Sequence, residues 1–311
     1  MTKMNYAVLF PGQGSQAVGM CQDVRAARPD LFGDAANTTL GWNLNELIEN
    51  GPQEILTETQ HAQPALFATS YALYDEFASM VSAPPRAAAG HSLGEYTAFA
   101  AAGALSYLDG LALVAKRGEA MAKCAASQSS GMAALLGMDA ETAESVAERR
   151  RADGGKLYVA NLNAPGQVVV AGGSDDIAWL VENARDLGVR RAIALDVAGG
   201  FHSPFMADAA HALDEALRST EFAPAQFDVY ANATAQATTD ARQTLSDQLT
   251  APVRFHETLL NIADAGIKTF VHVGPGDVTA GLAKRTVPGS DVKIVSTIEE
   301  ARSVAEELSV Q

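Results

Sequence analysis

Short apolar runs alternate with longer amphipathic stretches along the chain, a pattern typical of an α/β fold. Residues 6–10 are all apolar and stop at the turn Pro11-Gly12, which predicts a buried strand. Residues 87–90 form a second apolar run and predict another strand. Helices are predicted for residues 64–79, 95–102 and 107–125. Pro64 suits the first turn of the first of these helices because its missing N–H is not needed there.

Beyond a predicted linker at residues 125–131, the pattern becomes a compact series of short elements. Strands are predicted for residues 132–137, 156–161, 167–171 and 190–195, and helices for residues 140–151 and 174–187. This βαββαβ order is that of a ferredoxin-like domain. We therefore predict a ferredoxin-like small domain at 127–197, inserted into a large α/β domain made of 1–126 and 198–311. Strands near 227–231, 269–273 and 292–296 would complete the sheet of the large domain.

Composition narrows the class of protein. Apolar residues make up 48% of the chain and charged residues 19%, which is an ordinary globular balance. The formal net charge of −15 disfavours a broad contact with nucleic acid. Residues 96–115 are mostly apolar but rich in Ala and Gly, so they predict an interior helix and no membrane span. Two cysteines and no signal-like N-terminus lead us to expect a soluble cytoplasmic protein.

The segment Gly90-His91-Ser92-Leu93-Gly94 has the G-x-S-x-G pattern, between a predicted strand and a predicted helix. A nucleophile on so sharp a turn needs glycine on each side because the backbone is crowded there. The turn exposes the serine oxygen and directs the following N–H groups toward a developing oxyanion. Ser92 is therefore a candidate nucleophile, with a chance match in a loop as the alternative.

A serine nucleophile needs a base, and the chain has six histidines. His202 stands out because glycines precede it and Ser203-Pro204 follow, which places it in an irregular segment. A structural histidine is the alternative. His91 is expected to point away from Ser92 and to pack. Arg117 is either a ligand-binding residue or an ordinary arginine at the end of its helix, with its charge in solvent.

Two other kinds of site find little support in the sequence. The segment from Gly12 to Ala17 fits a relaxed dinucleotide-binding pattern, but Pro11 stands in the turn and no second strand ending in Asp or Glu follows near residues 30–40. A nicotinamide-binding enzyme is therefore disfavoured. The sequence has no H-E-x-x-H motif and no paired cysteines, so no metal site is predicted.

Several motifs, taken in order, resemble those of the malonyl-CoA:acyl carrier protein transacylases and of the related acyltransferases of polyketide synthases. Besides the Ser92 turn and Arg117, they are Phe10-Pro11-Gly12-Gln13-Gly14-Ser15-Gln16, Gln63-Pro64-Ala65, Asn163-Ala164-Pro165-Gly166-Gln167, Phe201-His202-Ser203-Pro204, Gln248-Leu249-Thr250-Ala251-Pro252-Val253 and Val273-Gly274-Pro275-Gly276. The resemblance covers nearly the whole chain. It implies a hydrolase-like α/β large domain with a parallel sheet that carries the ferredoxin-like small domain.

The resemblance also implies roles for particular residues. Ser92 would be acylated, with His202 as its base. The N–H groups of Gln13 and Leu93 would form the oxyanion hole, and the main-chain carbonyl of Gln248 would orient His202 in place of a carboxylate. Arg117 would bind the malonyl carboxylate by two parallel hydrogen bonds, and Phe201 would contribute to the acyl pocket.

The implied reaction moves a malonyl group from malonyl-CoA to the phosphopantetheine thiol of an acyl carrier protein, with no cofactor beyond the coenzyme A thioester, which is a substrate. A monomer is expected. Two alternatives stay open. One is a polyketide acyltransferase acting in trans with a different acyl unit. The other is a serine thioesterase or hydrolase, which would place an acidic residue near its histidine.

Overall fold

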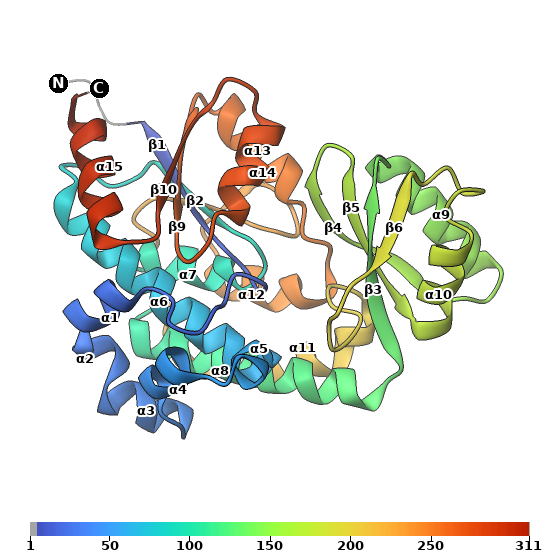
Figure 1. Ribbon diagram of the computed structural model, residues 1–311, viewed down its shortest axis with the longest axis horizontal. Helices are drawn as coiled ribbons and strands as arrows, with labels where there is room; N and C mark the ends of the chain where they lie inside the picture. The colour runs from blue at the N-terminus through green and yellow to red at the C-terminus, as the bar shows by residue number, and fades with distance from the viewer. Residues whose placement is uncertain (1–4, 311) are drawn as a thin grey trace.

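The computed structural model describes residues 5–310, which form a larger and a smaller part, each built on its own sheet (Figure 1). The larger sheet has the strand order β10-β9-β1-β2-β7-β8. Its strand pairs are parallel except β7–β8. The strands are β1 Tyr6–Phe10, β2 Ala87–Gly90, β7 Asp228–Tyr230, β8 Ala237–Thr238, β9 Thr269–Val273 and β10 Asp291–Val295. The parallel sheet of the predicted α/β class is confirmed.

Strand β1 shows why its residues read as one apolar run. Tyr6, Val8 and Phe10 belong to a core cluster that they share with α6, α7 and α8. The intervening Ala7 and Leu9 belong to a second cluster with α13 and α14 on the other face. A strand covered on both faces needs apolar residues at every position, which is typical of parallel sheets.

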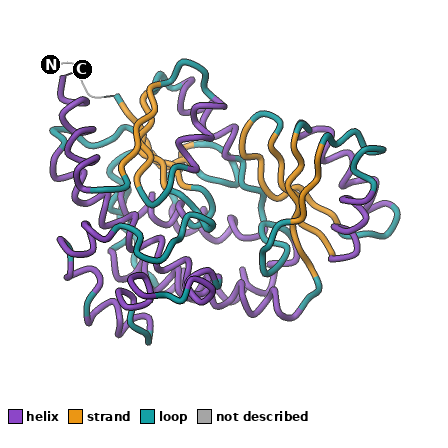
Figure 2. The backbone as a smooth tube through the Cα atoms, viewed as in Figure 1, coloured by secondary structure: helices purple, strands orange, loops and turns teal. Residues whose placement is uncertain are grey.

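The helices of the larger part lie on both sides of its sheet and below it (Figure 2). They are α1 Gln22–Ala27, α2 Pro29–Phe32, α3 Asp34–Leu40, α4 Leu44–Asn50, α5 Gln53–Thr57, α6 Thr59–Met80, α7 Gly94–Ala101, α8 Tyr107–Ser127, η1 Pro204–Met206, α11 Ala207–Ser219, α12 Ala241–Asp247, η2 Gln248–Thr250, α13 Phe255–Asp264, α14 Val278–Thr286 and α15 Ile298–Val310. Between residues 5 and 310, no helix is both long enough and apolar enough to cross a bilayer.

The smaller part is a four-stranded antiparallel sheet covered by two helices. Its elements, in chain order, are β3 Ser130–Leu136, α9 Ala140–Ala152, β4 Leu157–Ala164, β5 Gln167–Gly173, α10 Ser174–Glu182 and β6 Arg191–Ala194. The spatial strand order is β4-β5-β3-β6. This is the βαββαβ arrangement read from the sequence, whereas the exact domain boundaries stay a prediction.

Three expected segments differ from the structure. The helix predicted for 174–187 ends at Glu182. Helix α6 begins at Thr59, so Pro64 lies inside the helix and not in its first turn. The extra turn is held by α8, because a Cβ on Gly118 would lie 2.8 Å from Gln60 Cα and the two helices therefore pack in direct contact there. The predicted linker at 125–131 is also wrong, because α8 continues to Ser127 and β3 starts at Ser130.

The sequence reading placed no element in residues 11–63 apart from the turn after β1, and none in several later segments. The first gap contains α1 to α5, which are four to seven residues long. A helix of one or two turns shows too little periodicity to be recognised and forms only through tertiary packing.

Candidate active site

Ser92 lies on the turn between β2 and α7, in a strained conformation. Its φ is 52°, in the left-handed region that non-glycine residues avoid. A Cβ on Gly90 would lie 1.8 Å from the Gly94 carbonyl carbon, and one on Gly94 would lie 2.4 Å from the Phe10 carbonyl oxygen. The two glycines of the motif are therefore required because the turn is pressed between α7 and the end of β1.

Asn232, in the loop after β7, holds this turn in place. Its side-chain Oδ1 accepts the Ser92 N–H at 2.8 Å, and its Nδ2 donates to the Gly90 carbonyl at 2.7 Å. The residue is 1% exposed. Strained backbone persists only where its surroundings fix it, and this clamp supplies that constraint. The sequence reading gave Asn232 no role, and its only signal was its position just after a predicted strand.

His202 and Ser92 form a dyad, with His202 Nε2 lying 2.7 Å from Ser92 Oγ. On the other side of the ring, Nδ1 faces the carbonyl oxygens of Gln248 at 3.3 Å and Ala251 at 3.2 Å. Carbonyls only accept hydrogen bonds, so Nδ1 carries the proton and Nε2 is free to take one from Ser92. Gln248 thus lies where the resemblance implied, and Ala251 adds a second acceptor.

The protonation state of His202 follows from its surroundings. Burial lowers its pKa to about 3, with further lowering from the charge of Arg117 and from His91. The imidazole is therefore neutral at pH 7. A neutral imidazole that accepts from a serine hydroxyl is the arrangement required of a general base.

Arg117 lies in the middle of α8 and is 1% exposed, so the interpretation as a solvent-facing arginine at a helix end is wrong. That interpretation failed because the helix continues for ten residues beyond it, to Ser127. Its NH1 donates to Gln63 Oε1 at 2.8 Å, and its NH2 donates to Gln248 Oε1 at 2.9 Å and to Ser92 Oγ at 3.0 Å. The guanidinium also lies over the Tyr96 ring, 5.5 Å from its centroid.

The contacts of Arg117 depend on how α6 and α8 pack. Gly118 lets α8 approach the first turn of α6, which brings Gln63 to the guanidinium. Gln63 is buried, and its other amide atom, Nε2, donates to Met121 Sδ at 3.3 Å. Gln63 was part of a quoted motif, but no role was assigned to it, because only the tertiary packing brings it to Arg117.

A cavity of about 310 Å³ opens onto the dyad. The remaining residues named from the sequence, Gln13, Leu93 and Phe201, line it together with Ser92, His202 and Arg117. The smaller part closes the cavity with Asn161 and Asn163 of β4. The site therefore lies between the two parts of the chain and is built from both.

His91, expected only to pack, also lines this cavity. Its Nε2 lies 2.7 Å from Asn163 Oδ1, so it joins the nucleophile turn to the smaller part. Burial lowers the pKa of His91, and its ring is neutral at pH 7. The sequence placed it next to Ser92 but could not show its partner on β4.

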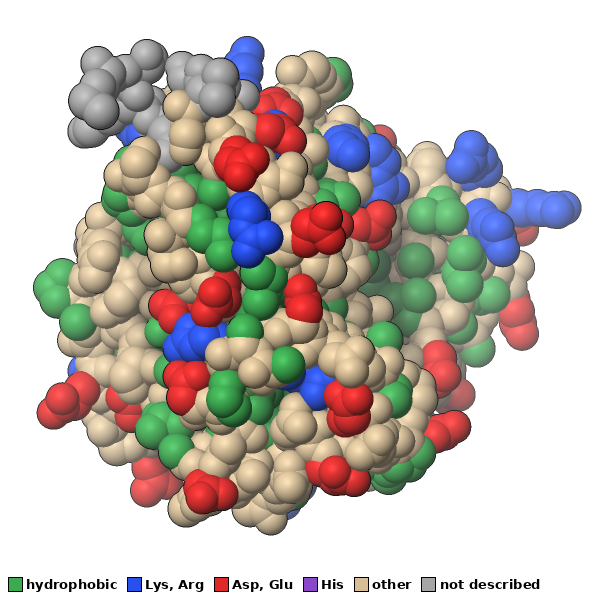
Figure 3. Space-filling view, turned by 60° about the vertical axis from the view of Figure 1, so that its left-hand side comes forward, with side chains coloured by type: hydrophobic (Ala, Val, Ile, Leu, Met, Phe, Trp, Pro, Cys, Tyr) green, Lys and Arg blue, Asp and Glu red, His purple; other side chains and the backbone are tan. Residues whose placement is uncertain are grey.

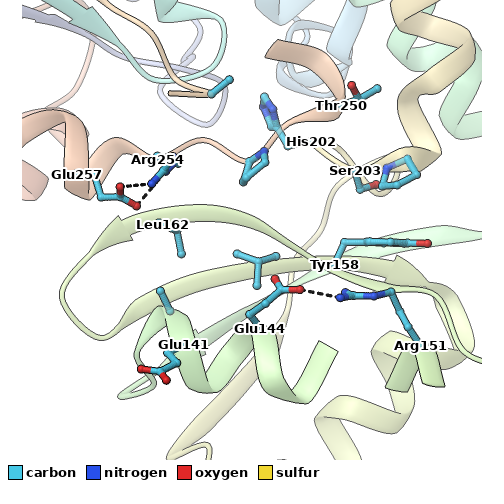
Figure 4. A pocket seen from close by; sticks show the side chains of 15 residues that line it. Glu141, Glu144, Arg151, Tyr158, Leu162, His202, Ser203, Thr250, Arg254 and Glu257 are labelled. Atoms are coloured by element: carbon cyan, nitrogen blue, oxygen red, sulfur yellow. Dashed lines mark hydrogen bonds and ion pairs between the residues drawn. The ribbon is translucent and has the colours of Figure 1, made fainter. Parts of the chain in front are cut away.

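A larger hollow of about 690 Å³ lies between α13 and the sheet of the smaller part (Figure 4). His202 and Ser203 line it, but Ser92 does not. Both of its arginines are paired with acidic residues, Arg254 with Glu257 and Arg151 with Glu144 at 2.7 Å, and Glu141 is the remaining charged residue of its lining. This hollow therefore offers no unpaired cation for a substrate carboxylate. Among residues 5–310, no group of three or more His, Cys, Asp or Glu residues is placed to hold a metal ion.

The comparisons with known proteins agree with this geometry. The profile of the acyl transferase domain family matches residues 8–306. A malonyl CoA-acyl carrier protein transacylase of Bacillus subtilis is 42% identical over 285 residues, covering 90% of this chain and 89% of that protein. One of Staphylococcus aureus is 36% identical over 304 residues, covering 95% of this chain and 97% of that protein.

Solved structures extend the likeness to the whole fold. The malonyl CoA-acyl carrier protein transacylase of Coxiella burnetii has a TM-score of 0.93 at 33% identity, covering 98% of each chain. A malonyl-transacylase solved in complex with a type II polyketide acyl carrier protein has a TM-score of 0.92 at 33% identity, covering 97% of this chain and 99% of that chain. With its Ser–His dyad and two-sheet fold, the chain belongs to the malonyl CoA-acyl carrier protein transacylase family.

Proposed function

We propose that this chain transfers a malonyl group from malonyl-CoA to the phosphopantetheine thiol of an acyl carrier protein, through an ester on Ser92. The observation that carries the proposal is the guanidinium of Arg117, 3.0 Å from the nucleophile oxygen and hydrogen-bonded to neutral partners. No carboxylate of residues 5–310 forms an ion pair with it. A buried cation lacking an acidic partner is suited to a substrate that brings its own carboxylate.

The first half-reaction follows from the dyad. Ser92 Oγ attacks the thioester carbonyl carbon while His202 Nε2 accepts its proton. The N–H groups of Gln13 and Leu93 stabilise the tetrahedral oxyanion. The C–S bond then breaks, and coenzyme A leaves as a thiol with the proton from His202. The malonyl ester stays on Ser92, with its carboxylate held by Arg117.

The second half-reaction runs the same steps in reverse order with a new thiol. His202 accepts the proton of the phosphopantetheine thiol, whose sulfur attacks the ester carbonyl, and Ser92 leaves with the proton returned to its oxygen. The two carbonyls that face His202 Nδ1 orient the ring without a carboxylate. A serine hydrolase would be expected to place an acidic residue there.

The reaction as proposed needs no cofactor, because the thioester already supplies an activated acyl group. The active form is proposed to be a monomer in the cytoplasm. The carrier protein is the proposed partner. Figure 3 shows several Lys and Arg side chains at the outer end of the smaller part, with Asp and Glu side chains beside them.

Intact mass after incubation with malonyl-CoA, methylmalonyl-CoA or acetyl-CoA tests the proposal. We expect one malonyl adduct, absent in Ser92→Ala. Arg117→Ala should lose the preference for malonyl over acetyl, because breaking a buried charge pair costs about 3–5 kcal/mol, or roughly two to three and a half powers of ten. Arg25→Ala is the matched control, since Arg25 is also a buried arginine but pairs with Glu49 far from the cavity.

Other results would change the proposal in defined ways. Release of coenzyme A without any adduct or carrier protein would replace it with a thioesterase. A methylmalonyl adduct formed as fast as the malonyl adduct would favour an acyltransferase of polyketide synthesis. Transfer from the acyl-enzyme to carrier proteins of each pathway, measured side by side, would identify the partner.

A further inference from the structure

Glu95 is a buried carboxylate next to the site that the proposed chemistry does not use. It lies in the first turn of α7 with 0% of its surface exposed. Its Oε1 accepts the main-chain N–H of Asn232 at 2.6 Å, and its Oε2 accepts Nε2 of Gln248 at 2.5 Å. Each oxygen thus accepts from one donor, and the donors come from the loop after β7 and from η2.

The first contact links Glu95 to the nucleophile turn. Asn232, whose main chain Glu95 holds, uses its side chain to bind the Ser92 N–H and the Gly90 carbonyl. Ser92 keeps a left-handed φ of 52° within this clamp. A carboxylate that fixes the loop of Asn232 therefore also fixes the turn that carries the nucleophile.

The second contact, together with a neighbouring one, decides which way the Gln248 amide faces, because Nε2 donates both to Glu95 and to the main-chain carbonyl of Ser92 at 2.7 Å. A carboxylate only accepts hydrogen bonds, so Gln248 must turn Nε2 toward Glu95. Its Oε1 then faces Arg117, where it accepts from NH2 at 2.9 Å. In the reversed orientation the amide would present N–H groups to the guanidinium and its oxygen to the carboxylate. Both of those contacts would be repulsive.

The ionised form of Glu95 is the one that fits these contacts. Burial raises its pKa to about 8, while the N–H of Asn232, the Gln248 amide and the charge of Arg117 act in the opposite direction. Both oxygens already accept an N–H, which is the geometry of a carboxylate. Above pH 8 the carboxylate form of Glu95 predominates.

We propose that Glu95 is a positioning residue that fixes the Gln248 amide, and through it the Arg117 guanidinium, for an acyl group that carries a carboxylate. This rests on the proposed malonyl transfer. Glu95 acts only through its neighbours, because its two hydrogen bonds go to Asn232 and Gln248 and not to Ser92 Oγ or His202. Its removal should therefore affect selectivity more than the basic reactivity of the dyad.

The test compares the rate constants for Ser92 acylation by malonyl-CoA and by acetyl-CoA, from mass spectra over time at pH 8.5. In Glu95→Gln the new amide can donate as well as accept, so Gln248 keeps only the Ser92 carbonyl as a fixed acceptor for Nε2 and its orientation is less constrained. We expect the malonyl rate constant to fall roughly 10- to 100-fold, as for a misplaced binding group. The acetyl rate constant should fall much less, so the ratio between them decreases.

Asp176→Asn is the matched control. Asp176 of α10 is a buried carboxylate that likewise accepts a main-chain N–H, from Lys156 at 2.9 Å, and a side-chain donor, Arg150 at 2.7 Å. It lies in the smaller part and does not line the cavity. Its substitution should lower Tm and leave the malonyl-to-acetyl ratio unchanged.

A second variant keeps the test informative if Glu95→Gln does not fold. Gln248→Met removes the amide but keeps the main-chain carbonyl that faces His202, so the same loss of ratio is expected. A lower Tm with an unchanged ratio in either folded variant would show a merely structural role and overturn the inference. Failure of the wild-type chain to form a malonyl adduct would instead overturn the proposed function.

Discussion

The imidazole of His202 gives the clearest example of a single residue set by its surroundings. Its pKa is lowered first by burial and next by the charge of Arg117. Since the base must be neutral, activity is present above this pKa and is lost as the pH falls through it. The acid limb of the acylation rate should therefore lie well below pH 6.5, the ordinary pKa of histidine.

Removing the charge of Arg117 should move that limb. In Arg117→Ala the pKa of His202 rises, because the positive charge that helps to lower it is gone. The pH at which the rate is half-maximal therefore shifts upward. Acetyl-CoA serves as the common substrate, and acylation is followed in short incubations from pH 2.5 to 8, a range that includes the wild-type pKa of about 3. Arg25→Ala should keep the wild-type midpoint. Equal midpoints in the wild-type and Arg117→Ala proteins would contradict the electrostatic link between the two residues.

Among the elements, the turn between β2 and α7 has the least space for an added side-chain atom. A Cβ on Gly94 would lie 2.4 Å from the Phe10 oxygen and 2.8 Å from the Pro11 oxygen, and both are backbone atoms. Gly94→Ala should lower the free energy of unfolding by about 3 kcal/mol, the upper end of the usual cost of overpacking. Denaturant titration measures this change.

Gly281 provides the comparison for Gly94. It lies inside α14, and a Cβ added there would meet no atom within 4 Å. Gly281→Ala should raise the free energy of unfolding by about 0.4–1 kcal/mol, because alanine restricts the unfolded chain. If Gly94→Ala were as well tolerated as Gly281→Ala, the crowding at the nucleophile turn would not be a real constraint.

For the molecule as a whole, buried histidines should determine stability in mild acid. His272 of β9 is 0% exposed and faces Thr279 of α14, and burial lowers its pKa to about 4. The unfolded chain takes up this proton near pH 6.5, and the folded chain does not until about pH 4. Stability is therefore lost as the pH falls through that window, by about 1.4 kcal/mol per pH unit for each such histidine. His202 acts in the same direction, and Glu95, with its raised pKa, in the other.

The variant His272→Gln removes one of the groups that take up a proton on unfolding. Between pH 6.5 and 5, its free energy of unfolding should fall less steeply with decreasing pH than that of the wild-type chain. The difference in slope should correspond to about one proton. Urea titrations at several pH values measure this slope. An identical slope in both proteins would mean that His272 is protonated equally in the folded and unfolded chains.

How far the sequence predicts this protein differs between its elements. The strands β1 and β2 were predictable because burial on both faces leaves a continuous apolar run. The βαββαβ series was predictable because its short strands and amphipathic helices follow each other in a recognisable order. Helices α1 to α5 were not, since each spans only one or two turns. The start of α6 was misplaced because a local rule about Pro64 was outweighed by packing against Gly118, a contact between residues distant in the sequence.

The sequence by itself determined the α/β class and, through short motifs read as a resemblance, the candidate dyad and Arg117. These follow from local order, because a strained nucleophile turn needs glycines at fixed positions whatever surrounds it. Only the tertiary structure decided that Arg117 is buried and lacks an acidic partner, and that Asn232 holds the nucleophile turn in place. It also decided that Glu95 links Gln248 to Asn232. These contacts link residues 25 to 156 positions apart, and no pattern within a single segment encodes such distances.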